Sequence, residues 1–514
     1  MPDLLPTALF GLTLLAFVGL GEALRAWAGW RPEATRRTVH ALTGVAVALC
    51  PPFFSSPAGI YALAALFVGI NVVAVRRRLF RGMHGTARET WGTVAFPLAL
   101  IAALFLCWTL PHPLTPPFVE GSRVYILRVA FLVLAVADPV AAWVGGRASG
   151  GRYRVNGQTK TAAGSLAFVA SAGAVAALGF ALWAPWGGLA LVASGAVLVA
   201  ALAGAAEAIG SRGWDNLWIV LAVVVGGTAF HLAATGLVLH STPEAEVLPL
   251  LGALALAGAF AAFSVRVGFL DVSGGLAAGL LAWAVVGIGG VAWAVPGFVF
   301  FFASSVLSRL GKRRKREAEA KAAKGSRRDA QQVAANGGVA GAVLAAALFA
   351  PWDWGPLLYW SYVGAFAAAA ADTWGTEIGT WVGGRTWDVA RLRAVAPGES
   401  GGVSLAGSLG GVAGAAVVVV VALPFFADAF LGHPPLGAPS VAAAVAAGAG
   451  VLAAWVDSAL GATVQARFRL PDGSLSERPG AGPLARGWAW VTNDRVNLAC
   501  TLVGAAVPLA VLAW

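Results

Sequence analysis

The chain of 514 residues is 59% hydrophobic and only 11% charged. This composition excludes an ordinary water-soluble enzyme. It predicts an all-α polytopic membrane protein with about 14–16 transmembrane helices, counting roughly 20 apolar residues per crossing. The net charge of +11 would suit nucleic-acid binding, but the basic residues lie in short connections between apolar segments, where they set topology. We therefore expect a lipid bilayer, and no nucleic acid, as a partner.

The apolar segments begin with Leu4 to Leu24. No basic residue precedes this segment and no convincing cleavage site follows it, so we expect a retained helix, not a signal peptide. If it runs from outside to inside, about 33 of the 35 Lys and Arg residues fall in inner connections, as the positive-inside rule requires. Both termini then face outward, and the protein is expected in a bacterial cytoplasmic membrane.

The chain divides near "HSTPEAEVLP" (240–249), because about eight apolar segments precede this stretch and about eight follow it. We predict one membrane domain over residues 1–240 and another over 248–514, in the same orientation. Residues 309–329 of the second domain hold ten Lys and Arg residues. Such a charge run predicts a cytoplasmic loop that is helical or contacts anionic lipid, and we assign it no chemistry.

The polar motifs recur between the two halves. The first half contains "ADPVAAWVGGR" (137–147) and the second contains "ADTWGTEIGTWVGGR" (371–385). Both fit Ala-Asp-x6-Gly, and both end in Trp-Val-Gly-Gly-Arg, displaced in the second by four residues, which is close to one helical turn. Asp138 and Asp372 are therefore predicted to be equivalent, whereas Glu377 has no counterpart.

Two further matches follow in the same order. "KTAAGSLA" (160–167) aligns with "ESGGVSLA" (399–406) through Ser-Leu-Ala, so that Glu399 replaces Lys160. Each half then has an acid near the end of an apolar helix and an Asp/Asn cluster that opens the next helix, in "GWDN" (213–216) and "VTNDRVN" (491–497). Three ordered matches predict two divergent copies of one catalytic architecture.

Carboxylates within spanning segments cost about 2.5–3.5 kcal/mol on insertion scales, and they normally face protein or water and have a function. The alternative for Asp138 or Asp372 is a structural polar network. Oxygen ligands suit Mg²⁺, which one or two carboxylates hold together with substrate phosphates. Lys160 and nearby arginines would bind phosphate oxygens, and an Asp beside the acceptor would accept its proton. The pattern indicates phosphoryl or nucleotidyl transfer, without a phosphate loop or protein-kinase motif.

These motifs carry a resemblance to known families. Residues 36–224 resemble the phytol kinase and dolichol kinase family through "RRTVHALTG", "ETWGTVAFPLAL", "ADPVAAWVGGR", "TKTAAGS" and "AEAIGSRGWDNLWIVLA". Residues 269–503 resemble membrane phytyl-phosphate kinases, related to the transmembrane protein 19 group, through "QQVAANGG", "ADTWGTEIG", "PGESGGVSLAGS", "DSALGATVQ" and "TNDRVN". Among the histidines only His40, in the first motif, lies near a basic cluster.

The resemblance implies a fusion of consecutive steps, in which an isoprenoid alcohol is phosphorylated by the first half and the prenyl phosphate by the second. The implied cofactor is Mg²⁺, and the donor is CTP or another nucleoside triphosphate. The expected catalytic residues are Asp138, Lys160 and Asp372. Expected nucleotide or phosphate ligands are Arg147, Thr161, Gly164, Ser165, Asn216, Arg385, Ser400, Gly401, Ser404, Asn493, Arg495 and Asn497. Expected metal ligands are Asp138, Glu207, Asp215, Asp372, Glu377, Asp457 and Asp494.

Two alternatives use the same residues. A membrane cytidylyltransferase acting on a lipid phosphate would need the same acids and cations, but it would release pyrophosphate where a kinase releases CDP. A transporter or flippase for a phosphorylated lipid would use the acids as an ion relay. A parallel repeat suits it too, but the acids lie near inner loops, not at the midplane of inverted repeats.

Asp372 and Glu377 are five residues apart, which places them about 140° from one another on an ideal helix. They are therefore not a simple same-face pair. Either the helix loosens near Gly375 or Gly379, or the two acids serve different partners.

Overall fold

The computed structural model describes residues 3–77, 91–110, 123–235, 243–310, 327–430, 438–478 and 480–513. These ranges contain sixteen α-helices, and twelve of the helices described are long and apolar enough to cross a membrane. The predicted all-α polytopic fold is confirmed. Most of the predicted basic loop, residues 311–326, and the stretch 236–242 near the predicted domain boundary lie outside the described residues.

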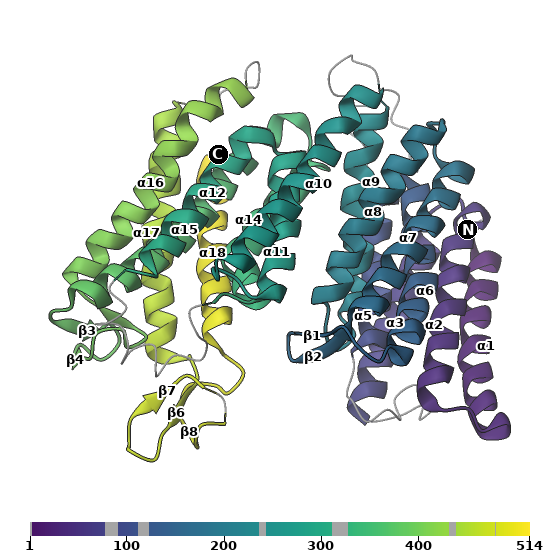
Figure 1. Ribbon diagram of the computed structural model, residues 1–514, viewed down its shortest axis with the longest axis horizontal. Helices are drawn as coiled ribbons and strands as arrows, with labels where there is room; N and C mark the ends of the chain where they lie inside the picture. Colours follow the sequence, from purple (N-terminus) through teal and green to yellow (C-terminus); the bar gives the residue numbers. More distant parts are fainter. Residues whose placement is uncertain are drawn as a thin grey trace. The chain divides into compact units, whose positions relative to one another are not determined.

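The chain forms two compact units, residues 1–254 and 255–514, each a bundle of helices (Figure 1). The helices of the first unit are α1 (Leu4–Ala28), α2 (Pro32–Leu49), α3 (Ala58–Arg77), α5 (Gly92–Leu104), α6 (Val124–Arg147), α7 (Ala162–Trp183), α8 (Leu189–Ile209) and α9 (Asp215–Ala234), with short turns η1 (Pro51–Phe53) and η2 (Phe105–Thr109). The helix α10 (Pro243–Arg266) spans the boundary in sequence.

The second unit continues with α11 (Val272–Trp283), η3 (Ala284–Ile288), α12 (Gly290–Leu307), α14 (Ala330–Ala347), η4 (Trp352–Trp354), α15 (Gly355–Val382), α16 (Leu405–Ala429), α17 (Pro439–Thr463) and α18 (Asn493–Leu512). Its central helix is α15, which packs against α12, α14, α16, α17 and α18. Every residue from Pro356 to Ala371 is buried, as expected for a helix that is apolar all round. Asp372 follows directly, as the first charged residue of α15.

The helix α6 has the same position within the first unit. It packs against α2, α7 and α9, and its apolar residues are mostly buried up to Ala137, the residue before Asp138. Each unit therefore places one Asp directly after the buried part of its central helix.

Short antiparallel strands fill the connections that follow α6, α15 and α17. The first pair is β1 (Arg152–Val155) and β2 (Gln158–Thr161), joined by Asn156 and Gly157 with positive φ, the usual chemistry of a two-residue hairpin. The second unit has β3 (Thr386–Asp388) between β4 (Ala394–Val395) and β5 (Gly402–Val403), and β6 (Arg467–Arg469) between β7 (Leu475–Ser476) and β8 (Leu484–Arg486). Both of these sheets lie at one end of the second unit's helices (Figure 1).

In both units, a glycine of the central helix packs against the N-cap residue of the helix that follows. Thr161 is the N-cap of α7 and accepts a hydrogen bond from the Gly164 amide, and Ser404 is the N-cap of α16 and accepts one from the Gly407 amide. Both are standard N-caps. A Cβ on Gly145 would lie 2.9 Å from the Thr161 hydroxyl, and one on Gly379 would lie 3.1 Å from the Ser404 hydroxyl.

The positions of these two N-caps correct the alignment predicted from the sequence. "TAAGS" (161–165) corresponds to "SLAGS" (404–408), because each begins with the N-cap and has its packing glycine at the fourth position. The predicted match through Ser-Leu-Ala was wrong by four residues, because it aligned identical residues and not the N-caps of the two helices. Lys160 therefore corresponds to Val403 and not to Glu399. The match of Asp138 with Asp372 is kept, because each Asp lies seven residues before the glycine of its own helix that contacts the N-cap.

Candidate active site

Four of the predicted polar residues of the first unit lie close together. Lys160 on β2 donates a hydrogen bond to Glu207 Oε1 at 2.6 Å, and both side chains are at most 14% exposed. The same ammonium group also contacts the Glu207 carbonyl oxygen. Asp215, at the start of α9, interacts electrostatically with Asp138 and Lys160. Four predicted residues are thus brought together, with Lys160 already paired to an acid.

The other predicted residues of this unit are occupied by contacts within the protein. The Ser165 hydroxyl is hydrogen-bonded to the Tyr153 hydroxyl at 2.5 Å, and the Asn216 amide donates to the Gly92 carbonyl at 2.9 Å. Arg147 lies over the ring of Trp143, at 4.1 Å from its centroid. Thr161 caps α7, and Gly164 allows α6 and α7 to approach closely.

Sequence reasoning left His40 and Arg36 out of this cluster. His40 on α2 hydrogen-bonds the Leu134 carbonyl and interacts electrostatically with Asp138 and Asp215. Within the described part of the chain, its Nε2 and Nε of Arg36 are both buried without a hydrogen-bond partner. The available signal was the position of His40 beside a basic cluster in "RRTVHALTG".

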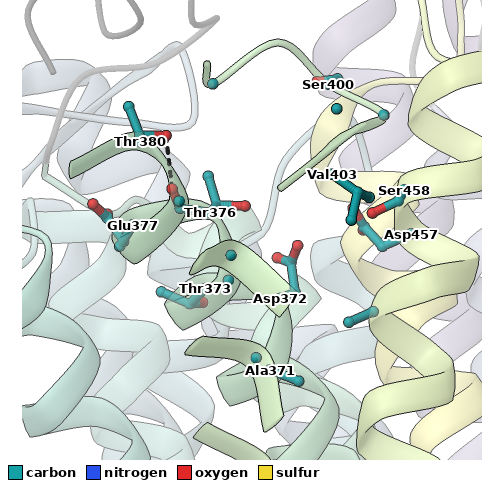
Figure 2. Close-up of a pocket in the computed structure, with 18 of the residues that line it drawn as sticks. Ala371, Asp372, Thr373, Thr376, Glu377, Thr380, Ser400, Val403, Asp457 and Ser458 are labelled. Atoms are coloured by element: carbon teal, nitrogen blue, oxygen red, sulfur yellow. Dashed lines mark hydrogen bonds between the residues drawn. The ribbon is translucent and has the colours of Figure 1, made fainter. Parts of the chain in front are cut away.

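The second unit contains a cavity of about 380 Å³ at the end of the helices where the strands lie. Residues of α14, α15, α16, α17 and α18 line it, together with the connection from Gly398 to Ser404. Figure 2 shows Asp372 in the centre of this region, with Asp457 and Ser458 on one side and Glu377 on the other. The predicted residues Asp372, Glu377 and Asp457 are therefore brought to one cavity.

The three acids belong to one set of charged groups. The carboxyl groups of Asp372 and Asp457 interact electrostatically with one another, and Glu377 and Asp372 both interact with Arg328. The helix α15 runs unbroken through Gly375 and Gly379, so the loosened helix of the first predicted alternative is not found. Asp372 and Glu377 share Arg328 as a partner, and Asp372 also interacts with Asp457. Both glycines instead accommodate α16, because a Cβ at either would lie 3.1 Å from an atom of that helix or its cap.

A close carboxyl pair of this kind can share one proton or one cation. Asp457 Oδ1 is buried and has no hydrogen-bond partner among the described residues, so the pair offers an unused oxygen. Among the described residues, no group of three or more His, Cys, Asp or Glu side chains is arranged to hold a metal ion by itself. Mg²⁺ requires only one or two carboxylates when substrate phosphates complete its ligands, and the Asp372–Asp457 pair fits that requirement.

Most predicted phosphate ligands of the second unit line the cavity, but its predicted arginines do not. Ser400, Gly401, Ser404, Asn493 and Asn497 line it. Ser400 donates to Glu477 Oε1 at 2.6 Å. Arg385 and Arg495 are exposed over the rings of Trp387 and Trp490 and are not among the lining residues, and neither is Asp494.

The arginine that lines the cavity is Arg328, which belongs to the charge run that was given no chemistry. Burial lowers the pKa of its guanidinium and the two acids raise it, but arginine stays charged in proteins. Sequence reasoning also missed Gln332 and Asn336, four residues apart on α14, although both belong to the quoted motif "QQVAANGG". Further lining residues that were missed are Thr373, Thr376, Thr380, Ser408, Ser458 and Glu477.

One wall of the cavity is apolar and faces away from the unit. Val412 on α16 and Trp455 on α17 both line the cavity, yet their side chains are 48% and 51% exposed. Val451 and Ala454 continue this wall. Val412 lies seven residues after the first residue of α16, about 10 Å along the helix. The cavity thus joins a polar end to an apolar flank between two spanning helices.

Comparison with known proteins places this cavity within a known family. The integral membrane protein DUF92 family matches residues 255–505, which include every residue that lines the cavity. Protein PGR of Arabidopsis thaliana is 30% identical over 209 residues, covering 38% of this chain and 72% of that protein. The chain belongs to the integral membrane protein DUF92 family.

Two further relatives come from Synechocystis sp. An uncharacterized membrane protein is 26% identical over 233 residues, covering 45% of this chain and 78% of the relative. A phytol kinase is 27% identical over 190 residues, covering 37% of this chain and 76% of the relative. A phytol kinase is therefore among the relatives of this DUF92 protein, as the sequence motifs predicted. No solved structure matches the chain.

Proposed function

We propose that this protein is a bifunctional membrane kinase that phosphorylates an isoprenoid alcohol to its monophosphate and then to the diphosphate. The distant similarity to a phytol kinase supports a prenol kinase. The observation that carries the second step is the DUF92 cavity, which combines a pair of acids, a half-buried arginine and an exposed apolar flank. Phosphate chemistry and a prenyl chain need these two environments side by side.

In the second unit, the acceptor is a prenyl monophosphate whose tail lies along Val412 and Trp455. An oxygen of this phosphate attacks the γ-phosphorus of the nucleotide, the bond from that phosphorus to the β,γ-bridging oxygen breaks, and the nucleoside diphosphate leaves. A phosphate monoester is largely ionised at neutral pH, since its second pKa is about 6, so this step needs no strong general base. Arg328 stabilises the charge on the transferred group.

Asp372 and Asp457 would hold Mg²⁺ through their carboxylate oxygens. When bound there, the ion supplies charge neutralisation for the β- and γ-phosphates of the nucleotide. Ser400, Asn493 and Asn497 line the same cavity and would donate hydrogen bonds to phosphate oxygens. Glu377 holds Arg328 in place from the other side.

The first unit would phosphorylate the alcohol, and a hydroxyl acceptor must lose its proton. Asp138 is the proposed base or metal ligand, with Glu207, Asp215 and Asn216 as metal or nucleotide ligands and Lys160 as the phosphate clamp. Because Lys160 is bonded to Glu207 in this structure, binding of a nucleotide there requires the lysine to exchange that carboxylate for a phosphate oxygen.

The test is turnover with defined substrates in detergent or nanodiscs. The purified protein is given radiolabelled CTP or ATP with phytol, geranylgeraniol or undecaprenol, and monophosphate and diphosphate products are separated. The proposal requires label in a prenyl phosphate and release of a nucleoside diphosphate. Release of pyrophosphate would indicate a cytidylyltransferase, and binding of prenyl phosphate without any nucleotide turnover would indicate a transporter; either result contradicts the proposal.

A further inference from the structure

A second pocket, of about 510 Å³, lies beside the cavity of the second unit. Three arginines and two serines line it, namely Arg309, Arg327, Arg328, Ser305 and Ser308, together with Phe269 and the neighbouring backbone. None of its described lining residues is acidic. Its volume is within the range of about 300–1,000 Å³ usual for small-molecule sites, and its charge suits an anion with several negative charges.

The arginines of this pocket are held by the chain around them. Arg309 lies over the ring of Phe269, at 4.0 Å from its centroid, and contacts the Val267 carbonyl oxygen. Arg327 lies over Gly268, since a Cβ at that glycine would be 3.5 Å from its Nε. The Arg328 amide donates to the Phe269 carbonyl at 3.1 Å, and its carbonyl accepts from the Asp271 amide at 3.1 Å.

This short backbone pairing is fixed at both ends by helix caps. Asp271 caps α11 and Asp329 caps α14, with Asp329 and Gln332 forming a capping box. The Ser273 hydroxyl, which is also bonded to Asp271, accepts from the Ala330 amide at 3.0 Å. The pocket therefore has a rigid floor, which lowers the entropy that ligand binding must overcome.

The pocket and the cavity are adjacent, because Arg328 and Ser308 line both. Arg328 interacts electrostatically with Glu377 and Asp372 on the cavity side. No hydrogen bond or ion pair of its guanidinium is found among the described residues. A guanidinium placed between an acidic site and a basic pocket is suited to a ligand whose charged chain extends from one to the other.

We propose that this pocket binds the phosphate chain of the nucleotide donor, with Arg309 and Arg327 on the phosphates farther from the reaction and Arg328 next to the transferred group. This inference rests on the proposed function, since it names the donor subsite of the same cavity. It gives the DUF92 unit an arginine-based nucleotide site in place of the glycine-rich loop that the sequence lacks.

The same arginines are compatible with two alternative roles. An anionic lipid headgroup carries the same phosphate chemistry and reaches basic pockets at a membrane surface. Alternatively, Arg328 is only the counter-charge of Glu377 and Asp372. The counter-charge alternative gives no role to Arg309 or Arg327, because Arg328 is the arginine that acts on Asp372.

The experiment measures binding separately from catalysis. Equilibrium binding of the non-hydrolysable β,γ-methylene analogues of CTP and ATP is measured for the full-length protein and for Arg309→Gln and Arg327→Gln. Both arginines are exposed, so these variants should fold, and a thermal unfolding scan checks this. The matched control is Arg266→Gln, an exposed arginine next to Val267 that does not line the pocket. Arg309→Lys keeps the positive charge but removes the planar guanidinium group, which can donate two parallel hydrogen bonds to a phosphate.

We expect each glutamine variant to bind the analogue about tenfold more weakly, as for loss of a charge-assisted hydrogen bond, with Arg309→Lys intermediate and Arg266→Gln within about twofold of the parent protein. Unchanged analogue binding in both glutamine variants overturns the inference. Loss of phosphatidylglycerol binding with unchanged analogue binding also overturns it and assigns the pocket to lipid. If the parent protein binds the analogue but forms no prenyl diphosphate, the proposed function fails while the nucleotide site stands.

Discussion

The two units use one helical frame for two different polar interiors. In each, a central helix carries an Asp seven residues before a glycine, and that glycine packs on the N-cap of the next helix. In the first unit the predicted lysine and amide are bonded within the protein, Lys160 to Glu207 and Asn216 to Gly92. In the second unit the predicted acids line a cavity. Both units keep a buried carboxylate oxygen without a hydrogen-bond partner among the described residues, on Glu207 and on Asp457.

The difference shows how a repeat can be kept while its chemistry diverges. Caps and packing glycines are fixed by backbone geometry and tolerate little change. The charges around them are free to change, provided that each buried charge has a partner. The first unit uses a lysine beside its acid, whereas the second pairs two acids and takes its cation, Arg328, from a connection that precedes α14.

The largest expected effect is on catalysis in the second unit. Asp457→Asn should lower the rate of prenyl diphosphate formation by about a hundredfold or more, because it removes a charged group placed for the phosphates. The thermal midpoint should not fall, since the change relieves the repulsion of two close carboxyl groups. Radiolabel transfer and a thermal unfolding scan measure the two effects. Asp353→Asn, at an exposed acid near the opposite end of α15, is the control.

An Asp457→Asn protein that transfers label at the parental rate would contradict the assignment of the pair. A variant with a clearly lower thermal midpoint would contradict the expectation that the substitution relieves repulsion between the two carboxyl groups.

The second prediction concerns stability in the first unit, where removing one charged group should destabilise the protein. Lys160→Met should lower the free energy of unfolding by about 3 kcal/mol, because Glu207 is left buried without its partner. The double variant Lys160→Met/Glu207→Gln should recover most of this loss, as a double-mutant cycle in detergent can measure. Arg154→Met, at an exposed position on β1, is the control. A single variant as stable as the parent would show that the pair is not a structural element of this unit.

The shared frame is tested by adding one methyl group in each unit. Gly145→Ala and Gly379→Ala should each destabilise by about 1–3 kcal/mol, since overpacking a close helix contact forces the backbone to shift. Gly146→Ala is a matched control, because a Cβ there meets nothing within 4 Å. Thermal unfolding of the three variants gives the comparison. If Gly145→Ala behaves like Gly146→Ala, the first unit does not use this contact.

The smallest expected effect concerns the caps. Thr161→Ala and Ser404→Ala should each cost about 1 kcal/mol, the usual value for loss of an N-cap hydrogen bond. Thr161→Ser and Ser404→Thr keep the hydroxyl and should stay close to the parent protein. Similar shifts in thermal midpoint for the two alanine variants would support the corrected register, whereas a shift at only one position would argue against equivalent caps.

Much of this organisation could be predicted from the sequence. Hydropathy indicated the polytopic fold, and the recurrence of Ala-Asp-x6-Gly identified Asp138 and Asp372 as equivalent residues, because that spacing matches the frame that both helices use. The alignment of the next motif could not be predicted from residue identity, because Ser-Leu-Ala begins four residues after the N-cap Thr161 in the first unit and at the N-cap Ser404 itself in the second. Only the hydrogen bonds of Thr161 and Ser404 identify the start of each helix.

The cation of the second site was missed for a different reason. Arg385 and Arg495 lie close in sequence to the acidic motifs, but their side chains stack on exposed tryptophans. Arg328 is far from Asp372 in the chain and reaches it because α11 and α14 begin side by side. Proximity in the sequence cannot reveal a contact that depends on the packing of two helix caps.

Supplying each step with its own substrate tests most directly whether each unit performs one phosphorylation. Asp138→Asn and Asp372→Asn proteins are incubated with radiolabelled nucleotide and either phytol or phytyl monophosphate, and the products are separated. We predict that Asp372→Asn converts phytol to the monophosphate and stops there, and that Asp138→Asn fails on phytol but converts the supplied monophosphate to the diphosphate. Diphosphate formation by Asp372→Asn at the parental rate, or normal phosphorylation of phytol by Asp138→Asn, would contradict the assignment of one step to each unit.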